Sequence, residues 1–188
     1  MNAIHKLIDK YKVTLSPQSV DQFISIVERK KYQKDEIILK QGLTSRYMYF
    51  IEQGIIRQFY YKEGRDITEH FSSEGDIAAC IESLFLKEPS HINIEAIETS
   101  IIYRINYEKF KILSNKYPEI NCLYQAILEY KLIVSQKKAD SWRFENSHDR
   151  YKRFCKEFPI VSKRVSIAHI ASYLLMTPET LSRVRAII

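Results

Sequence analysis

The chain has few of the residues that interrupt or cross-link a polypeptide. Of its 188 residues, four are glycine, five are proline and three are cysteine. The cysteines, at positions 80, 122 and 155, are widely spaced and form no CxxC pair. This pattern disfavours zinc and iron–sulfur sites and is typical of reduced thiols in a cytosol. Apolar residues make up 45% and charged residues 28% of the chain, which indicates a globular protein and not a disordered one.

Long apolar runs are missing as well. No run approaches the roughly 20 residues that span a bilayer, and residues 1–11 lack the apolar core of a signal peptide. Enzyme signatures are also absent, because the five histidines are scattered and no HExxH, GxSxG or Walker motif occurs. We therefore expect a cytoplasmic protein that has no membrane segment, is not an enzyme and binds neither a metal nor a cofactor.

Positive charge is concentrated toward the C-terminus. The net charge is +6, and residues 137–185 contain eleven Lys or Arg against five acidic residues. Cations near phosphates release condensed counterions, so this imbalance favours a nucleic-acid partner for the C-terminal part.

The four glycines mark the corners of a β-rich region between residues 29 and 106. They lie at positions 42, 54, 64 and 75, between short runs of β-branched and aromatic residues. The spacing predicts an antiparallel sandwich or barrel. Residues 1–28 are expected to be helical, with Ser16 before Pro17 as an N-cap, and residues 77–86 to be a short helix or loop. The predicted strands are 36–40, 47–52, 55–61, 66–71, 92–97 and 100–105.

A long helix is predicted over residues 119–141. It follows a short helix at 107–116, which Tyr117-Pro118 ends. The apolar spacing of three and four favours a dimerisation seam, and the alternative is an amphipathic helix lying on the chain's own core. A second stripe of residues 124, 128 and 132 lets one helix face both a partner and its own domain. The predicted seam is Ile120, Leu123, Ile127, Tyr130 and Val134.

Residues 166–188 have the pattern of a helix-turn-helix unit, preceded by a predicted helix at 146–158 with Ser147 as its cap. Thr177 is a predicted N-cap before Pro178, and Ala171 is small enough for two helices to cross closely. Leu175-Met176 forms the predicted connection. The alternative is an ordinary helical hairpin with a solvated charged face. The predicted inner faces comprise Ile167, Ile170, Ala171, Leu174, Leu181, Val184 and Ile188.

The outward face of the last helix carries chemistry that suits base recognition. An arginine can grip guanine O6 and N7, and a carboxylate can accept from cytosine N4. Arg183 and Glu179 supply these groups and are four residues apart, so they can also pair with each other. We expect phosphate contacts from residues 163, 164, 166 and 182. The complete predicted DNA-binding set is Lys163, Arg164, Ser166, Thr177, Glu179, Thr180, Ser182 and Arg183.

The order of these regions resembles the Crp/Fnr family of bacterial regulators over nearly the whole chain. The resemblance rests on residues 30–42, 47–60, 64–65 and 71–76, and most specifically on IASYLLMTPETLSRVR at 170–185. SYL and TPETLSR look like the subset common in Bacteroidetes. The resemblance implies an α+β fold: an antiparallel β-roll of the jelly-roll type with flanking helices, a long dimerisation helix and a C-terminal helix-turn-helix. The implied domains are a cyclic-nucleotide-binding-like sensor at 1–117, a dimerisation helix and hinge at 118–145, and a DNA-binding domain at 146–188.

The resemblance also locates a ligand pocket within residues 75–96. An ungapped match places Cys80 at the family's ribose-binding glutamate, Ser90 at its phosphate-binding arginine and His91 at the adjacent Ser/Thr. A guanidinium fork normally compensates the desolvation of a cyclic phosphate. We therefore expect cAMP to bind poorly, and the effector to be another small molecule or none. The candidate pocket residues are Gly75, Cys80, Glu82, Ser90 and His91.

Two further departures from the family concern DNA. Pro178 stands where some members have a base-reading arginine, so the target sequence should differ. The family's β-wing would follow the last helix, and the chain stops at Ile188, so the wing is expected to be absent or trimmed. We expect a homodimer that binds double-stranded DNA at a near-palindrome, with half-sites about 34 Å apart. The alternative is a small-molecule sensor whose C-terminal helices contact another protein.

Overall fold

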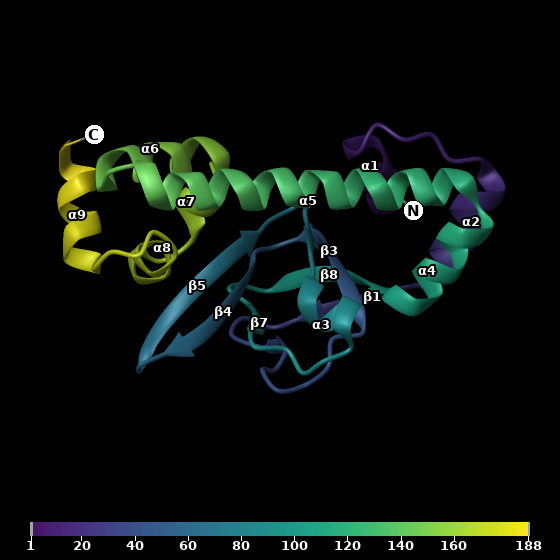
Figure 1. Cartoon of the computed structure of the whole chain (residues 1–188), viewed down its shortest axis with the longest axis horizontal. Coiled ribbons are helices and arrows are strands. Elements are labelled where there is room, and N and C mark those ends of the chain that lie inside the picture. The colour runs from purple at the N-terminus through teal and green to yellow at the C-terminus, as the bar shows by residue number, and fades with distance from the viewer. Residues whose placement is uncertain (1, 188) are drawn as a thin grey trace.

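Two antiparallel sheets face each other in the N-terminal half of the chain (Figure 1). The computed structural model describes residues 2–187. One sheet has the strand order β1-β8-β3-β6 and the other β2-β7-β4-β5, so the predicted antiparallel roll is confirmed. The strands are β1 (Val27–Tyr32), β2 (Ile37–Leu39), β3 (Tyr47–Gln53), β4 (Ile56–Lys62), β5 (Arg65–Ser72), β6 (Ile77–Ala78), β7 (Asn93–Ala96) and β8 (Ser100–Asn106).

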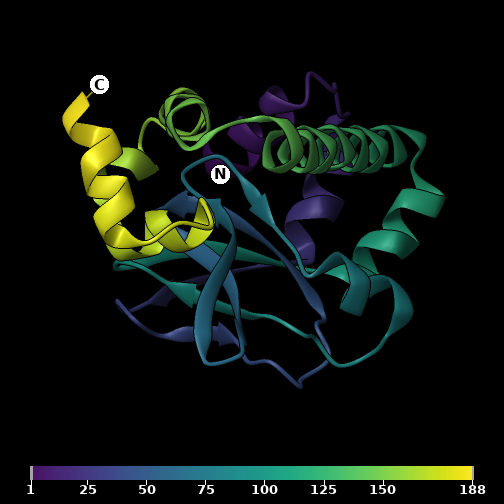
Figure 2. The same cartoon turned by 60° about the vertical axis from the view of Figure 1, so that its left-hand side comes forward.

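Helices precede, interrupt and follow the roll. Figure 2 shows α5 above the strands and α8 between α9 and the roll. No helix within residues 2–187 combines the length and apolar character that a membrane crossing requires. The helices are α1 (Asn2–Lys10), α2 (Pro17–Ser25), α3 (Ile81–Leu86), α4 (Tyr107–Lys116), α5 (Pro118–Phe144), α6 (Ser147–Glu157), α7 (Val161–Arg164), α8 (Ile167–Tyr173) and α9 (Pro178–Ile187).

Strand β1 was not predicted. The helical segment ends at Ser25, and residues 27–32 pair with β8 along their whole length. Four of these six residues are exposed, because β1 lies at the edge of its sheet. An edge strand with the sequence VERKKY shows no alternation of apolar and polar residues, so its pattern could not be separated from that of a helix end.

One local prediction for the C-terminal half is corrected. Asn146, and not Ser147, caps α6, because its side-chain oxygen accepts a hydrogen bond from the backbone N–H of Asp149 at 3.0 Å. Both residue types favour this position, and the sequence did not decide between them. The stretch between α6 and α8 contains a further short helix, α7.

Gly54 shows why the corners of the roll require glycine. Its φ angle is +100°, in the left-handed region. An added Cβ would lie 2.8 Å from the backbone Cα of Ser100. Any side chain would therefore clash with β8 as well as strain the turn.

Helix α5 packs its first half against the roll. Ile120, Leu123 and Ile127 are buried in one core together with Phe50 of β3 and Ile105 of β8. The interpretation of these three residues as a dimer seam is therefore corrected in favour of the alternative, an amphipathic helix on its own core. The physical reason is that β3 and β8 present an apolar surface that this stripe covers.

The C-terminal helices share a core with the end of the roll. Phe154 of α6, Tyr173 of α8 and Leu181 of α9 are buried in one cluster with Ile55 and Phe71. The rings of Phe71 and Tyr173 are 5.6 Å apart between centroids. The helix-turn-helix is thus seated on the roll and does not extend away from it.

Candidate nucleic-acid interface

Helices α8 and α9 form the predicted helix-turn-helix geometry. The Ser166 hydroxyl accepts from the backbone N–H of His169 at 3.2 Å and caps α8. Leu175 has a φ of +54°, and the chain turns back through a hydrogen bond from Met176 N–H to the Ala171 carbonyl at 3.0 Å. The caps and the turn give α8 and α9 a defined relative orientation.

The start of α9 is confirmed at the predicted cap. The Thr177 hydroxyl accepts from the backbone N–H of Thr180 at 3.2 Å, and Pro178 is the first helical residue. Pro fits there because the first N–H of a helix has no partner within it.

The inner faces of α8 and α9 agree with the sequence pattern except at Ile167. This residue, in the first turn of α8, is 39% exposed. Ile188 lies outside the described residues. The remaining predicted positions are buried in the C-terminal core: Ile170, Ala171, Leu174, Leu181 and Val184.

The outward face of α9 is open to solvent. Thr177, Glu179, Ser182 and Arg183 are exposed, while Thr180 is half-buried. All five lie on one short helix or at its cap. An α-helix fits into the major groove of B-DNA, so this face has the size and the polarity that base recognition needs.

Glu179 is held by the start of α9 and forms no ion pair with Arg183. Its own backbone N–H and the Thr177 hydroxyl lower the pKa of the Glu179 carboxyl, and the positive charge of Arg183 contributes further. The predicted pairing of the two side chains is therefore corrected: the carboxylate is satisfied by the helix end, which leaves the Arg183 guanidinium available to another partner.

Some of the residues predicted to contact phosphates have exposed side chains, and others form hydrogen bonds or ion pairs within the protein. Lys163 is exposed, and Ser166 is exposed although its hydroxyl caps α8. Arg164 contacts two carboxylates of the roll. Its Nη1 lies 2.9 Å from Oε1 of Glu74, its Nε lies 3.3 Å from Oε2 of Glu98, and its Nη2 donates to Oε1 of Glu98. The turn before α8 is thus tied to the roll.

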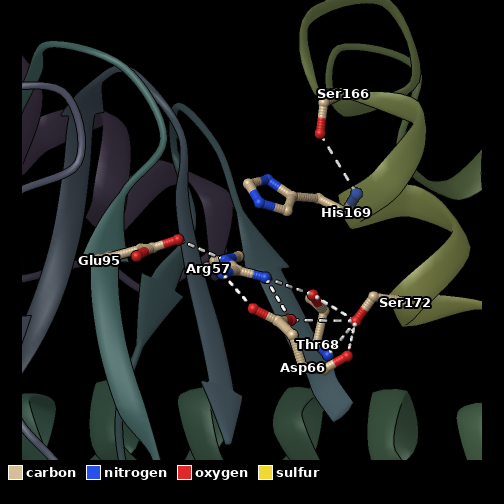
Figure 3. A network of polar contacts seen from close by, with 7 residues as sticks. All are labelled: Arg57, Asp66, Thr68, Glu95, Ser166, His169 and Ser172. Carbon is tan, nitrogen blue, oxygen red and sulfur yellow. Dashed lines mark hydrogen bonds and ion pairs between the residues drawn. The ribbon is translucent and has the colours of Figure 1, made fainter. Parts of the chain in front are cut away.

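A second polar network, shown in Figure 3, seats α8 on the β4–β5 hairpin. The Ser172 hydroxyl donates to the backbone carbonyl of Asp66 at 2.8 Å and accepts from the backbone N–H of Thr68 at 2.7 Å. Arg57 binds both oxygens of the Asp66 carboxylate, each at 2.7 Å, and Glu95 at 2.5 Å. Sequence reasoning missed this network, because residues that are hydrogen-bonded to each other in it are separated by up to 106 positions.

Arg57 is the buried centre of that network. It is only 4% exposed. Burial disfavours its charge, but the hydrogen bonds that it donates to Asp66 and Glu95 raise its pKa above the ordinary value. His169 of α8 points toward the guanidinium (Figure 3). Burial, together with the charge of Arg57, lowers the pKa of His169, so its ring is neutral at pH 7.

A cavity of about 400 Å³ lies between the roll and α5. Of the five predicted pocket residues, Cys80, Glu82 and His91 line it. Gly75 and Ser90 do not: Gly75 lies in the β5–β6 turn, and the buried Ser90 hydroxyl donates to the Ile92 carbonyl at 2.8 Å. No arginine is among the lining residues, and the Nδ1 of His91 lies 3.0 Å from Glu82.

Sequence reasoning did not identify the cations that α5 contributes to this cavity. Lys131, Ser135 and Lys138 line it from α5, and Glu69 lines it from β5. Burial lowers the pKa of Lys131 and of Lys138 to about 8 in each case. Lys138 donates to the Glu69 backbone carbonyl. The cavity therefore has acidic groups at its roll side and ammonium groups at its helix side.

Comparison with known proteins agrees with this geometry. Residues 29–117 match the model of the cyclic nucleotide-binding domain. The chain is 27% identical over 90% of its length to an anaerobic regulatory protein of Pasteurella multocida, of which the match covers 66%. It is 29% identical, again over 90% of its length, to the fumarate and nitrate reduction regulatory protein of Vibrio cholerae, of which 72% is covered.

The chain is similar in sequence to these regulators and similar in fold to Crp/Fnr regulators. A solved structure from Eubacterium rectale, assigned to the Crp/Fnr family of transcriptional regulators, superposes with a TM-score of 0.70 at 15% identity, covering 92% of this chain and 83% of that one. The chain thus shares the fold of that protein from the roll to the helix-turn-helix. It spans about two thirds to three quarters of the length of the named relatives.

Proposed function

We infer that this protein is a DNA-binding transcriptional regulator of the Crp/Fnr type that works in the cytoplasm as a homodimer. The observation that carries the inference is the outward face of α9: a capped, well-packed helix presents Arg183 and Ser182 to solvent on the side opposite its core. The named relatives are regulatory proteins. A helix displayed in this way is the reading element of helix-turn-helix proteins.

Base recognition is assigned to Arg183 and Glu179. The Arg183 guanidinium suits guanine, and the Glu179 carboxylate suits the amino group of cytosine. Thr177, Thr180 and Ser182 supply hydroxyls around them, while Lys163, Arg164 and Ser166 supply phosphate contacts from the turn before α8.

The dimer contact is assigned to the solvent side of α5. Leu132 is 69% and Ile133 52% exposed, and Tyr130 is exposed beside them. Large apolar side chains gathered on one helix favour burial against a second copy. Val134 is half-buried and lines the cavity between the roll and α5. The contact therefore lies on a face next to the predicted seam. We propose that the sensor domain ends at residue 117 and that the DNA-binding domain begins at residue 146.

The effector is assigned to a class other than cyclic nucleotides. Glu69 and Glu82 line the cavity, no arginine does, and Ser90 is not among its lining residues. An anionic phosphate next to two carboxylates and without an arginine fork is poorly compensated for the loss of its hydration. A small molecule with a cationic or hydrogen-bonding group toward Glu82 suits the site better.

The decisive test is DNA binding by the full chain. Fluorescence anisotropy with a duplex from the region upstream of its own coding sequence should show binding that weakens steeply as salt rises. Arg183→Ala should weaken it about 10- to 100-fold, whereas Arg185→Ala, which removes an equal charge from the same helix, should change it less than about threefold. Absence of salt-sensitive binding to this duplex overturns the function. Unchanged DNA affinity for Arg183→Ala, with loss of a protein partner, would favour the sensor alternative.

A further inference from the structure

The contact between Arg164 and the roll has a surplus of negative charge. One guanidinium faces two carboxylates, Glu74 from the β5–β6 turn and Glu98 from the β7–β8 turn. Glu74 is also held in place, since its Oε1 accepts from the backbone N–H of Gly54 at 2.9 Å. The cluster carries one net negative charge. It lies beside Lys163 and two residues before the cap of α8, on the segment to which the proposed function assigns phosphate contacts.

We propose that Glu74 and Glu98 compete with DNA phosphates for Arg164, so that the roll itself weakens DNA binding. This proposal rests on the proposed function, because it requires that the turn before α8 faces a duplex. Carboxylates and phosphates bind a guanidinium in the same bidentate way. Two carboxylates therefore occupy the donors that one phosphate would use, and their surplus charge repels the backbone of an approaching duplex.

The exchange needs no movement of the helix-turn-helix. Arg164 is 37% exposed in its side chain, and Val161 and Val165 anchor the same turn in the C-terminal core. The arginine side chain can therefore rotate from the carboxylates to a phosphate while α8 and α9 stay seated on the roll. The Arg57–Ser172 network differs, because its central arginine is buried and it holds α8 itself.

The competition predicts that removing the carboxylate charges strengthens DNA binding. The experiment uses the full chain and a fluorescent 30-base-pair duplex of mixed sequence, because phosphate contacts do not depend on base sequence. At low salt, Glu74→Gln with Glu98→Gln should bind about three- to tenfold more tightly than the unmodified protein, the range expected for two exposed ion pairs. Glu98→Gln alone, with no other side-chain bond to lose, should give part of this gain. The gain should shrink as salt rises, since exposed pairs are screened.

A charge-matched control separates competition from a general rise in positive charge. Asp21 and Glu88 are exposed, form no ion pair within the described residues, and lie in α2 and in the loop after α3. Asp21→Asn with Glu88→Gln changes the net charge by the same two units. Its gain in affinity should be clearly smaller than that of the Glu74 and Glu98 variant.

A double-mutant cycle makes the test specific to Arg164. In an Arg164→Ala background, the Glu74 and Glu98 substitutions should give no more gain than the control pair. If the gain persists there, or if the two glutamate substitutions leave binding unchanged or weaken it, the contact is a structural anchor only and the proposal is wrong. If the unmodified protein shows no salt-sensitive binding to any duplex, the proposed function fails instead. The two failures are therefore distinguishable.

Discussion

Helices α9 and α5 are both amphipathic, yet periodicity assigned their faces with different success. In α9 one apolar stripe, residues 181 and 184, is buried, and the polar side is open to solvent. In α5 the stripe of residues 120, 123 and 127 was assigned to a partner but covers the chain's own roll. Periodicity identifies residues that share a face, but it does not say what covers that face. The ambiguity in α5 arises because apolar residues occur on more than one side of it.

The sharpest test of this comparison uses two leucines of α5. Leu123 is fully buried and Leu132 is exposed. Leu123→Ala should lower the free energy of unfolding by about 2–5 kcal/mol, because it leaves a cavity in the core. Leu132→Ala should leave the unfolding free energy of the monomer nearly unchanged and raise the dissociation constant of the dimer. Urea denaturation at low protein concentration and sedimentation across a concentration series measure the two effects. Equal loss of monomer stability in both variants would show that the assignment of the two faces is wrong.

A second test concerns His70, which lies under α5 in the cavity wall. Burial, together with the charges of Lys131 and Lys138, lowers its pKa well below the ordinary value. The unfolded chain takes up a proton near pH 6.5, whereas the folded chain does not. Stability is therefore full above that pH and decreases as the pH falls below it. Urea midpoints at pH 7.5 and 5.5 should differ in this direction.

The His70→Phe variant isolates that contribution. Phenylalanine keeps a ring against Phe158, whose centroid is 6.0 Å from that of His70, but it does not titrate. The variant should lose less stability between pH 7.5 and 5.5 than the unmodified protein, although His169 titrates in the same sense. An identical decrease in the two proteins would rule out His70 as a source of the pH dependence.

The smallest expected effect is that of cAMP. The roll-facing side of α5 and the acidic lining at Glu69 and Glu82 offer the cyclic phosphate no arginine. Adding about 100-fold excess of cAMP should therefore leave the melting temperature and the DNA affinity unchanged, since a ligand stabilises only the state it binds. A rise of several degrees in the melting temperature would show that Lys131 or Lys138 of α5 binds the phosphate in place of an arginine.

The difference between the two helices extends to the rest of the molecule. The caps at Ser166 and Thr177 and the positive-φ corner at Gly54 depend on residues close in sequence or on backbone conformation, and they were predictable. Strand β1 was missed because it lies at the edge of its sheet and its sequence does not alternate between apolar and polar residues. Gly75 and Ser90 were placed in the pocket by sequence order, whereas backbone turns and a hydrogen bond to Ile92 direct them elsewhere.

Local sequence was sufficient for the roll's antiparallel class, for the helix-turn-helix and for the polar face of α9. These features follow from spacing, capping and turn chemistry within a few residues. Other features could be identified only in the tertiary structure. They are the burial of Leu123, the lysines that line the cavity, the Arg57–Ser172 network and the ion pairs of Glu74 and Glu98 with Arg164. Each of them joins side chains that are dozens of residues apart, and such pairs leave no periodic signal in the chain.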